Sequence, residues 1–206
     1  MNINIDTFNN WAAEDKDLKM QKGHENAVDR MFELINERTK IFKSPFKFLD
    51  IGCGNGWAVR KALELENCIL SEGVDGAPEM IRKAKDQDKR STYYLEDIES
   101  WEPLKKYDII FSMEVFYYFK NPSQIISKLS KYLEKGGLLI IGIDHYAENT
   151  QTLNWDKEYN ISTNTFSIQN WKDFLINAGL KDVFYHQHGA KEDWKGTLIV
   201  LGNKKT

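Results

Sequence analysis

The stretch FKFLDIGCGNG, residues 46–56, decides how this chain is expected to fold. A short apolar run leads to an acid and then to three glycines at alternate positions, which predicts a buried strand that turns tightly into a helix. Glycine lets the backbone adopt positive φ in such a turn and lets it approach a ligand closely. The spacing is GxGxG after Asp50, and it differs from the GxGxxG that seats a pyrophosphate on a helix N-terminus. An acid at this point disfavours a phosphate and suits a cationic group.

Strands and helices alternate on both sides of this stretch. We expect a right-handed, mostly parallel sheet with helices on both faces, which is an α/β fold. The last two strands lie close enough in sequence to pair as an antiparallel hairpin. The predicted strands are 46–51, 68–74, 93–95, 107–111, 138–143, 183–188 and 197–201, and the predicted helices are 24–37, 57–65, 78–85, 122–136 and 167–178.

Length and composition favour an ordinary globular protein. The 206 residues, 41% hydrophobic and 29% charged, predict a single domain over 1–206. A net charge of −3 disfavours nucleic acid as a partner. Cys53 and Cys68 are too few for a disulfide framework or a four-ligand zinc site, and they suit a reducing compartment. Since no secretory signal or membrane-spanning run is visible, we expect a soluble cytoplasmic protein that does not bind membranes.

Acids also follow the second and third predicted strands. In an open parallel sheet, ligands bind beyond the carboxyl ends of the strands. Asp75, at the end of the second strand, is placed to accept hydrogen bonds from both hydroxyls of a ribose, and it could instead only cap the next helix. Glu96 or Asp97, after the third strand, is placed to accept from an adenine amino group, and we favour Asp97. Together with Asp50, these acids occur once per strand–helix unit.

At this point the chain resembles the class I S-adenosylmethionine (SAM)-dependent methyltransferases. The resemblance rests on residues 48–56, 74–75, 96–98 and 107–112. It implies a Rossmann-like, seven-stranded sheet, SAM as the cofactor and S-adenosylhomocysteine as the product. The cofactor contacts that follow are Asp50, Gly52, Cys53, Gly54, Asn55, Gly56, Asp75, Gly76, Met80, Glu96, Asp97, Ile98, Ser112 and Met113.

Candidate acceptor-side residues follow the fourth and fifth strands. Glu114, Tyr117 and Tyr118 lie where this family opens its acceptor pocket. His145, with a near-neutral reference pKa, is a candidate general base, although a histidine at a strand end is more often structural. We therefore predict Glu114, Tyr117 and His145 as catalytic, and no metal site. The predicted substrate pocket adds Trp11, His24, Tyr118, Tyr146 and Trp155.

Two segments are predicted to cover the acceptor site. Residues 1–23 form an N-terminal lead-in, and residues 144–166 form a connection that is long for a compact domain, as lid loops often are. Methyl transfer needs orientation of the acceptor and exclusion of water, and it needs a base only where a proton must leave.

The sequence thus favours methyl transfer to a small-molecule acceptor by in-line displacement, because the Asn/Asp-Pro-Pro-Tyr/Phe motif of base-methylating enzymes does not occur. The alternatives are a protein or nucleic-acid methyltransferase, a non-catalytic SAM-binding module, and a nicotinamide-dependent oxidoreductase.

Overall fold

Seven strands form one mixed sheet in the order β3-β2-β1-β4-β5-β7-β6 in the computed structural model, which describes residues 2–205. The predicted domain of residues 1–206 includes Met1 and Thr206, which lie outside the described residues. β1 to β5 run parallel, and β7 pairs antiparallel with both β5 and β6. The predicted α/β sheet with a C-terminal antiparallel hairpin is therefore confirmed. The strands are β1 (Phe46–Ile51), β2 (Cys68–Asp75), β3 (Thr92–Leu95), β4 (Tyr107–Met113), β5 (Leu133–Ile143), β6 (Lys181–His188) and β7 (Thr197–Asn203).

Seven α-helices and three short 3-10 turns surround the sheet in the described residues. α2 and α3 cover one face, α5 and α7 cover the other, and α4 packs beside the edge formed by β2 and β3. The helices are α1 (Ile3–Ala13), α2 (Lys16–Arg38), α3 (Trp57–Leu63), α4 (Pro78–Gln87), α5 (Pro122–Ser130), α6 (Trp155–Tyr159) and α7 (Ile168–Asn177).

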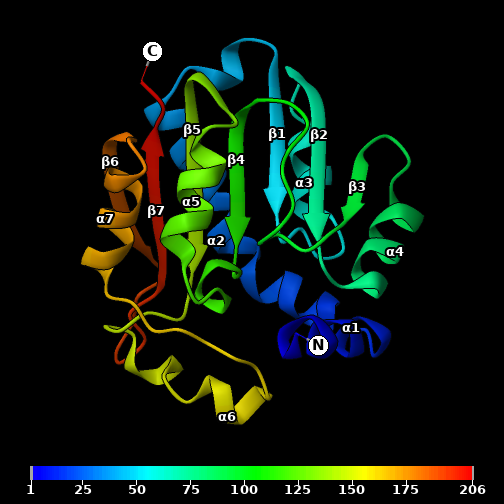
Figure 1. Ribbon diagram of the computed structural model, residues 1–206, viewed down its shortest axis with the longest axis vertical. Helices are drawn as coiled ribbons and strands as arrows, with labels where there is room; N and C mark the ends of the chain where they lie inside the picture. The colour runs from blue at the N-terminus through cyan, green and yellow to red at the C-terminus, as the bar shows by residue number, and fades with distance from the viewer. Residues whose placement is uncertain (1, 206) are drawn as a thin grey trace.

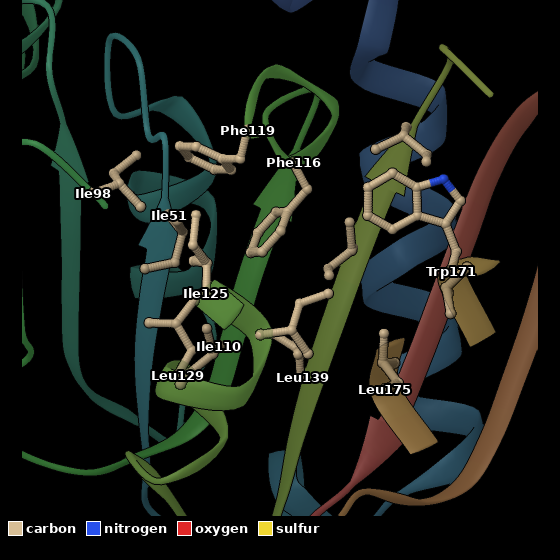
Figure 2. Close-up of a cluster of buried hydrophobic side chains, with 14 of the residues drawn as sticks. Ile51, Ile98, Ile110, Phe116, Phe119, Ile125, Leu129, Leu139, Trp171 and Leu175 are labelled. Carbon is tan, nitrogen blue, oxygen red and sulfur yellow. The ribbon is translucent and has the colours of Figure 1, made fainter. Parts of the chain in front are cut away.

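Alternate strand residues supply two separate apolar cores. Phe48 of β1 and Phe111 of β4 point toward α2, whereas Ile51 and Ile110 point to the opposite face, as the two-residue period of a strand requires. Figure 2 shows the second core, in which Ile125 of α5 packs over the sheet beside Ile110. Burial on both faces explains why these strands are continuous apolar runs in the sequence.

The prediction that the helix beginning at Pro122 extends to Gly136-Gly137 is wrong. α5 ends at Ser130, and β5 already begins at Leu133, which pairs with Tyr107 of β4. A Cβ on Gly137 would lie 3.0 Å from the Asp108 carbonyl oxygen, so this glycine permits close strand approach. Strand pairing overrides the helical spacing of Leu129 and Leu133.

The N-terminal lead-in is helical and lies against the functional end of the sheet. In Figure 1 the arrowheads of β1, β2 and β4 point toward α1, so the carboxyl ends of these strands face this helix. α2 begins at Lys16, eight residues before the predicted start at His24. The segment that includes α6 lies beside α1, where Asn4 exchanges hydrogen bonds with Ser162. Among the described residues, no helix is long and apolar enough to span a membrane.

Candidate active site

A cavity lies beyond the carboxyl ends of β1, β2 and β4, where the sequence placed the chemistry. It holds about 1140 Å³ of space, its open mouth included. Strand-end loops form its floor, and α1 with the first turns of α2 forms its cover. The cavity brings together most of the predicted cofactor residues, namely Asp50, Gly52, Cys53, Gly54, Asn55, Asp75, Gly76, Met80, Asp97, Ile98 and Met113.

The glycine loop is held against the end of β2. Gly52 and Cys53 both donate backbone hydrogen bonds to the Val74 carbonyl, and Gly52 has φ +73°. A Cβ on Gly52 would overlap the Val115 side chain, so only glycine fits both the dihedral angle and the space. In this conformation the loop lines the cavity with residues 52–55.

Asp75 organises the same loop through both carboxylate oxygens. One accepts from the Gly54 amide at 2.9 Å and the other from the Ala77 amide at 2.8 Å. Burial raises the pKa of Asp75 above its usual range, although these amides oppose the shift. The residue thus joins the glycine loop to the start of α4, and it still lines the cavity.

Asp50 is almost fully buried at the end of β1. Its Oδ1 atom has no hydrogen-bond partner among the described residues. Burial, followed by repulsion from Asp75, raises the pKa of Asp50 well above its ordinary value. A buried acceptor without a partner is costly, and it is satisfied when a ligand supplies a donor or a cation.

The segment after β3 contributes one wall of the cavity. Asp97, Ile98 and Glu99 line it, and the Asp97 side chain accepts a hydrogen bond from the Glu99 amide at 2.9 Å. Glu96 is exposed and lies outside the lining. Of the two acids that the sequence left open, the structure brings Asp97 to the cavity.

Glu114 lies at the other end of the cavity, after β4, and is the central polar residue there. It has φ +61°, a left-handed conformation that is uncommon for a residue with a side chain. Its carboxyl group accepts hydrogen bonds from the Asp144 amide and from the Tyr117 hydroxyl. Burial, with the nearby Asp144 carboxylate, raises the pKa of Glu114 to about 8. The chain holds this carboxyl group in a fixed position at the cavity wall.

His24 reaches the same end from α2. Its Nε2 atom lies 3.6 Å from Oδ2 of Asp144. Burial alone lowers the pKa of His24, but the Asp144 and Glu114 carboxylates more than offset this, so the pKa is raised. His24 and Tyr118, both predicted substrate-pocket residues, line the cavity.

Several predicted residues do not line the cavity. His145 is fully buried, and its ring nitrogens contact the Thr152 carbonyl at 3.0 Å and the Thr165 hydroxyl at 2.9 Å. The Tyr146 hydroxyl donates to backbone carbonyls of the β6–β7 connection. The others outside the lining are Trp11, Gly56, Glu96, Ser112, Tyr117 and Trp155.

These residues have structural surroundings instead. The Ser112 hydroxyl donates to the Ile51 carbonyl at 2.8 Å, which joins β4 to β1. A Cβ on Gly56 would overlap the Tyr93 ring. Trp11 and Trp155 both pack against Tyr159 with perpendicular rings, behind the cavity wall.

The two predicted cover segments differ in their contribution. From the lead-in, Ile5 and Phe8 of α1 line the cavity directly. Residues 144–166 contribute nothing to the described lining, and they contact α1 from outside through Asn160 and Ser162. The long segment supports the cover rather than forming it.

The sequence did not single out several lining residues. Asp17 of α2 accepts from the Asn55 side chain at 2.9 Å and pairs with Lys83 at 2.7 Å. Ile5, Gln21, Val115 and Phe119 also line the cavity. For Asp17, the sequence signal that could have been used is the pair of acids Asp15 and Asp17 before an apolar helical run, because acidic residues are typical of the first turn of a helix.

Comparison with known proteins bears on this site. The family model described as a methyltransferase domain matches residues 23–184. Malonyl-[acyl-carrier protein] O-methyltransferase 2 of Ilyobacter polytropus is 32% identical over 155 residues, which is 72% of this chain and 58% of that protein. A tRNA U34 carboxymethyltransferase of Haemophilus influenzae is 33% identical over 197 residues, 76% of this chain and 61% of that protein. The chain thus spans about 60% of the length of these two relatives.

Solved structures share the fold over nearly the whole chain. A chain from the complex between the Haloferax volcanii Trm112 methyltransferase activator and a methyltransferase superposes with a TM-score of 0.80 at 22% identity, covering 97% of this chain and 98% of that one. The SAM-bound magnesium protoporphyrin IX methyltransferase of Synechocystis superposes with a TM-score of 0.66 at 15% identity, covering 90% and 82%. The chain belongs to the methyltransferase domain family, and it shares the Rossmann-like fold of the SAM-bound methyltransferase from Synechocystis.

Proposed function

We propose that this enzyme transfers the methyl group of SAM to a small acceptor that carries no anionic group near the methyl-accepting atom. One observation carries this proposal. The cavity is lined by six carboxyl residues and by no lysine or arginine among the described residues. The six are Asp17, Asp50, Asp75, Asp97, Glu99 and Glu114.

The cavity chemistry fits SAM. The buried Oδ1 atom of Asp50 needs a donor or a cation, and SAM carries an ammonium and a sulfonium. Asp75 at the end of β2 suits the ribose hydroxyls, and Asp97 with the Ile98 amide suits the adenine ring. The open glycine loop suits the methionine part. When bound, SAM supplies an activated methyl group for in-line displacement.

The chain's own residues have three tasks at the acceptor end. Phe8 and Phe119, on the cover and the wall, exclude water from the reacting atoms. Tyr118 and Glu114 orient a hydrogen-bonding acceptor against the methyl group. These tasks support methylation of a neutral atom with a free electron pair, such as an amine nitrogen or a hydroxyl oxygen. The C–S bond of SAM breaks as the new bond forms, S-adenosylhomocysteine leaves, and the acceptor's proton passes to solvent.

The relatives act on different acceptors. Their names specify malonyl-[acyl-carrier protein] and tRNA, so they give no support to the prediction that nucleic acid is disfavoured. A malonyl group and an RNA backbone are both anionic. Asp97 and Glu99 are exposed on the cavity wall, so an anionic acceptor that approaches the cavity meets like charge, and this electrostatic argument favours a small acceptor without such a group.

The test uses SAM with an isotopically labelled methyl group and three fractions of a cell extract: metabolites, RNA and protein. We expect label in the metabolite fraction, in a product that keeps or gains positive charge or is neutral. Label in RNA or protein alone would overturn the acceptor class. Calorimetry with SAM and with NAD runs in parallel, and binding of NAD in place of SAM would overturn the cofactor assignment as well.

A further inference from the structure

We propose that His24, Glu114 and Asp144 form a binding site for one divalent metal ion at the acceptor end of the cavity. One ligand atom from each residue, the imidazole nitrogen or a carboxylate oxygen, lies within 4.8 Å of the others. The three residues come from α2, the loop after β4 and the loop after β5. Because they are far apart in sequence, the sequence predicted no metal site here.

In the part of the chain that the structure describes, no lysine or arginine compensates the two buried carboxyl groups of the cluster, and the one basic side chain beside them is the His24 imidazole, itself a candidate metal ligand. Glu114 is 8% exposed and Asp144 is 6% exposed. Among the described residues, the salt-bridge partner of this pair is His24 alone, and neither acid meets a lysine or arginine. Two adjacent buried carboxylates are costly unless a positive charge compensates them.

An unpartnered atom gives a second, independent observation. Oδ1 of Asp144 is buried and has no hydrogen-bond partner among the described residues. It belongs to the carboxyl group whose other oxygen faces His24 at 3.6 Å. Buried polar atoms are nearly always satisfied, so this oxygen indicates a ligand at the cluster.

Surrounding hydrogen bonds orient the cluster as they orient metal ligands in general. The Tyr117 hydroxyl donates to Glu114 at 2.8 Å and is in contact with the Tyr118 hydroxyl at 2.8 Å. The Asn149 side chain donates to the Asp144 carbonyl at 2.9 Å and fixes the start of that loop. The left-handed backbone at Glu114 directs its carboxyl group into the cluster, and such strain is typical of functional positions.

The ligand set selects a class of metal. One imidazole nitrogen and two carboxylate oxygens suit Zn²⁺, Mn²⁺ or Fe²⁺. Ca²⁺ takes six to eight oxygen ligands, and the cluster offers too few. Since His24 and Glu114 line the cavity, an ion held by the cluster would lie at the cavity wall. Metal binding does not depend on the acceptor's identity; only a role in orienting the acceptor rests on the proposed function.

The experiment uses the full chain after treatment with EDTA. Mn²⁺ or Zn²⁺ alone is titrated by calorimetry, and we expect one ion per chain and a higher melting temperature with metal. Glu114→Gln and Asp144→Asn keep the shape of each side chain, and each should weaken binding at least about tenfold. Glu99→Gln, which removes a carboxylate from the same cavity outside the cluster, should leave metal affinity unchanged.

Co²⁺ gives a further readout, because its visible absorption spectrum should change with His24→Gln. Failure of the wild-type chain to bind either ion would overturn the metal site. So would wild-type metal affinity in both Glu114→Gln and Asp144→Asn. SAM affinity is measured on the same EDTA-treated samples. SAM binding without metal binding overturns the metal site and leaves the proposed function standing, whereas loss of SAM binding in the wild-type chain counts against the proposed function.

Discussion

The two ends of the cavity are built in different ways. At the cofactor end, Asp50 and Asp75 lie at the carboxyl ends of β1 and β2, Asp97 follows β3, and the glycine loop joins the first two strands. At the acceptor end, Glu114 and Asp144 follow β4 and β5, but His24 comes from a helix that crosses the sheet face. The first end follows from strand order alone, while the second also requires a particular helix packing.

This difference has an energetic counterpart. At the cofactor end, Asp75 and Asp97 accept hydrogen bonds from backbone amides, and the exception is Asp50, whose buried Oδ1 atom has no partner among the described residues. At the acceptor end, Glu114 accepts hydrogen bonds from the Tyr117 hydroxyl and the Asp144 amide, whereas Oδ1 of Asp144 has no partner among the described residues. Changes at the cofactor end should therefore act first on SAM affinity, and the predictions below follow a decreasing effect on that affinity.

The largest loss is expected for Gly52→Ala. Its positive φ and the overlap with Val115 should lower the free energy of unfolding by about 2–5 kcal/mol and abolish measurable SAM binding. Denaturant unfolding and calorimetry measure the two effects. The matched control is Gly23→Ala in α2, where no atom lies within 4 Å, and this variant should gain about 0.5–1 kcal/mol. Equal behaviour of the two variants would contradict the importance of the loop geometry.

Asp75→Ala should come next. It removes the acceptor for the Gly54 and Ala77 amides as well as the proposed ribose contact, so SAM binding should weaken by about 1–3 kcal/mol. Calorimetry measures the change. Asp86→Ala on exposed α4 surface serves as control and should bind SAM as the wild-type chain does. Unchanged SAM affinity in Asp75→Ala would contradict the assignment of Asp75 to the ribose of SAM.

The difference between the cofactor end and the acceptor end of the cavity explains how much of the site could be predicted from the sequence. The acids at the carboxyl ends of β1, β2 and β3 were identified because a parallel sheet brings these ends to one edge, a rule that needs no side-chain packing. The same rule located Glu114. It failed for His145, whose buried ring contacts the Thr152 carbonyl and the Thr165 hydroxyl, and the neighbouring Asp144 is the residue that joins the cluster.

The packing of the helices against the sheet could not be predicted from the sequence patterns. The apolar positions of α2 predicted a helix but not its start at Lys16, nor that His24 would meet Asp144. The left-handed conformation of Glu114 gave no sequence signal, because it depends on the Asp144 amide and the Tyr117 hydroxyl. Likewise, pairing of Leu133 with β4 decided where α5 ends.

A smaller effect on SAM affinity is expected for Asp50→Asn, with an opposite effect on stability. The folded pKa of Asp50 is raised above the unfolded value, so its carboxyl group stabilises the fold only at low pH, and that contribution is lost as pH rises through the folded pKa. The unliganded variant should therefore melt higher than the wild-type chain at pH 7–8, by about 2–4 °C for each kcal/mol recovered. The difference should shrink toward pH 4.

Melting curves without ligand, taken across that pH range, measure the change. SAM titrations on the same variant should show weaker binding, because the charge that suits the cationic groups is gone. A variant that melts lower than the wild-type chain at every pH would show that Asp50 is satisfied without a ligand. That result would break the contrast between the two cavity ends.

The smallest effect on SAM affinity is expected for His145→Gln, and it tests the residue that the sequence proposed as a general base. The imidazole joins the Thr152 carbonyl to the Thr165 hydroxyl inside the segment that supports α1, so glutamine can restore only part of this bridge. Stability should fall by about 1–3 kcal/mol, while SAM affinity should stay within about twofold of the wild-type value. Denaturant unfolding and calorimetry separate the two. A His145→Gln variant with wild-type stability that fails to transfer the methyl group in the extract assay would contradict this structural role. His145 would then act in the reaction itself, and it could no longer be distinguished from the residues that face the acceptor.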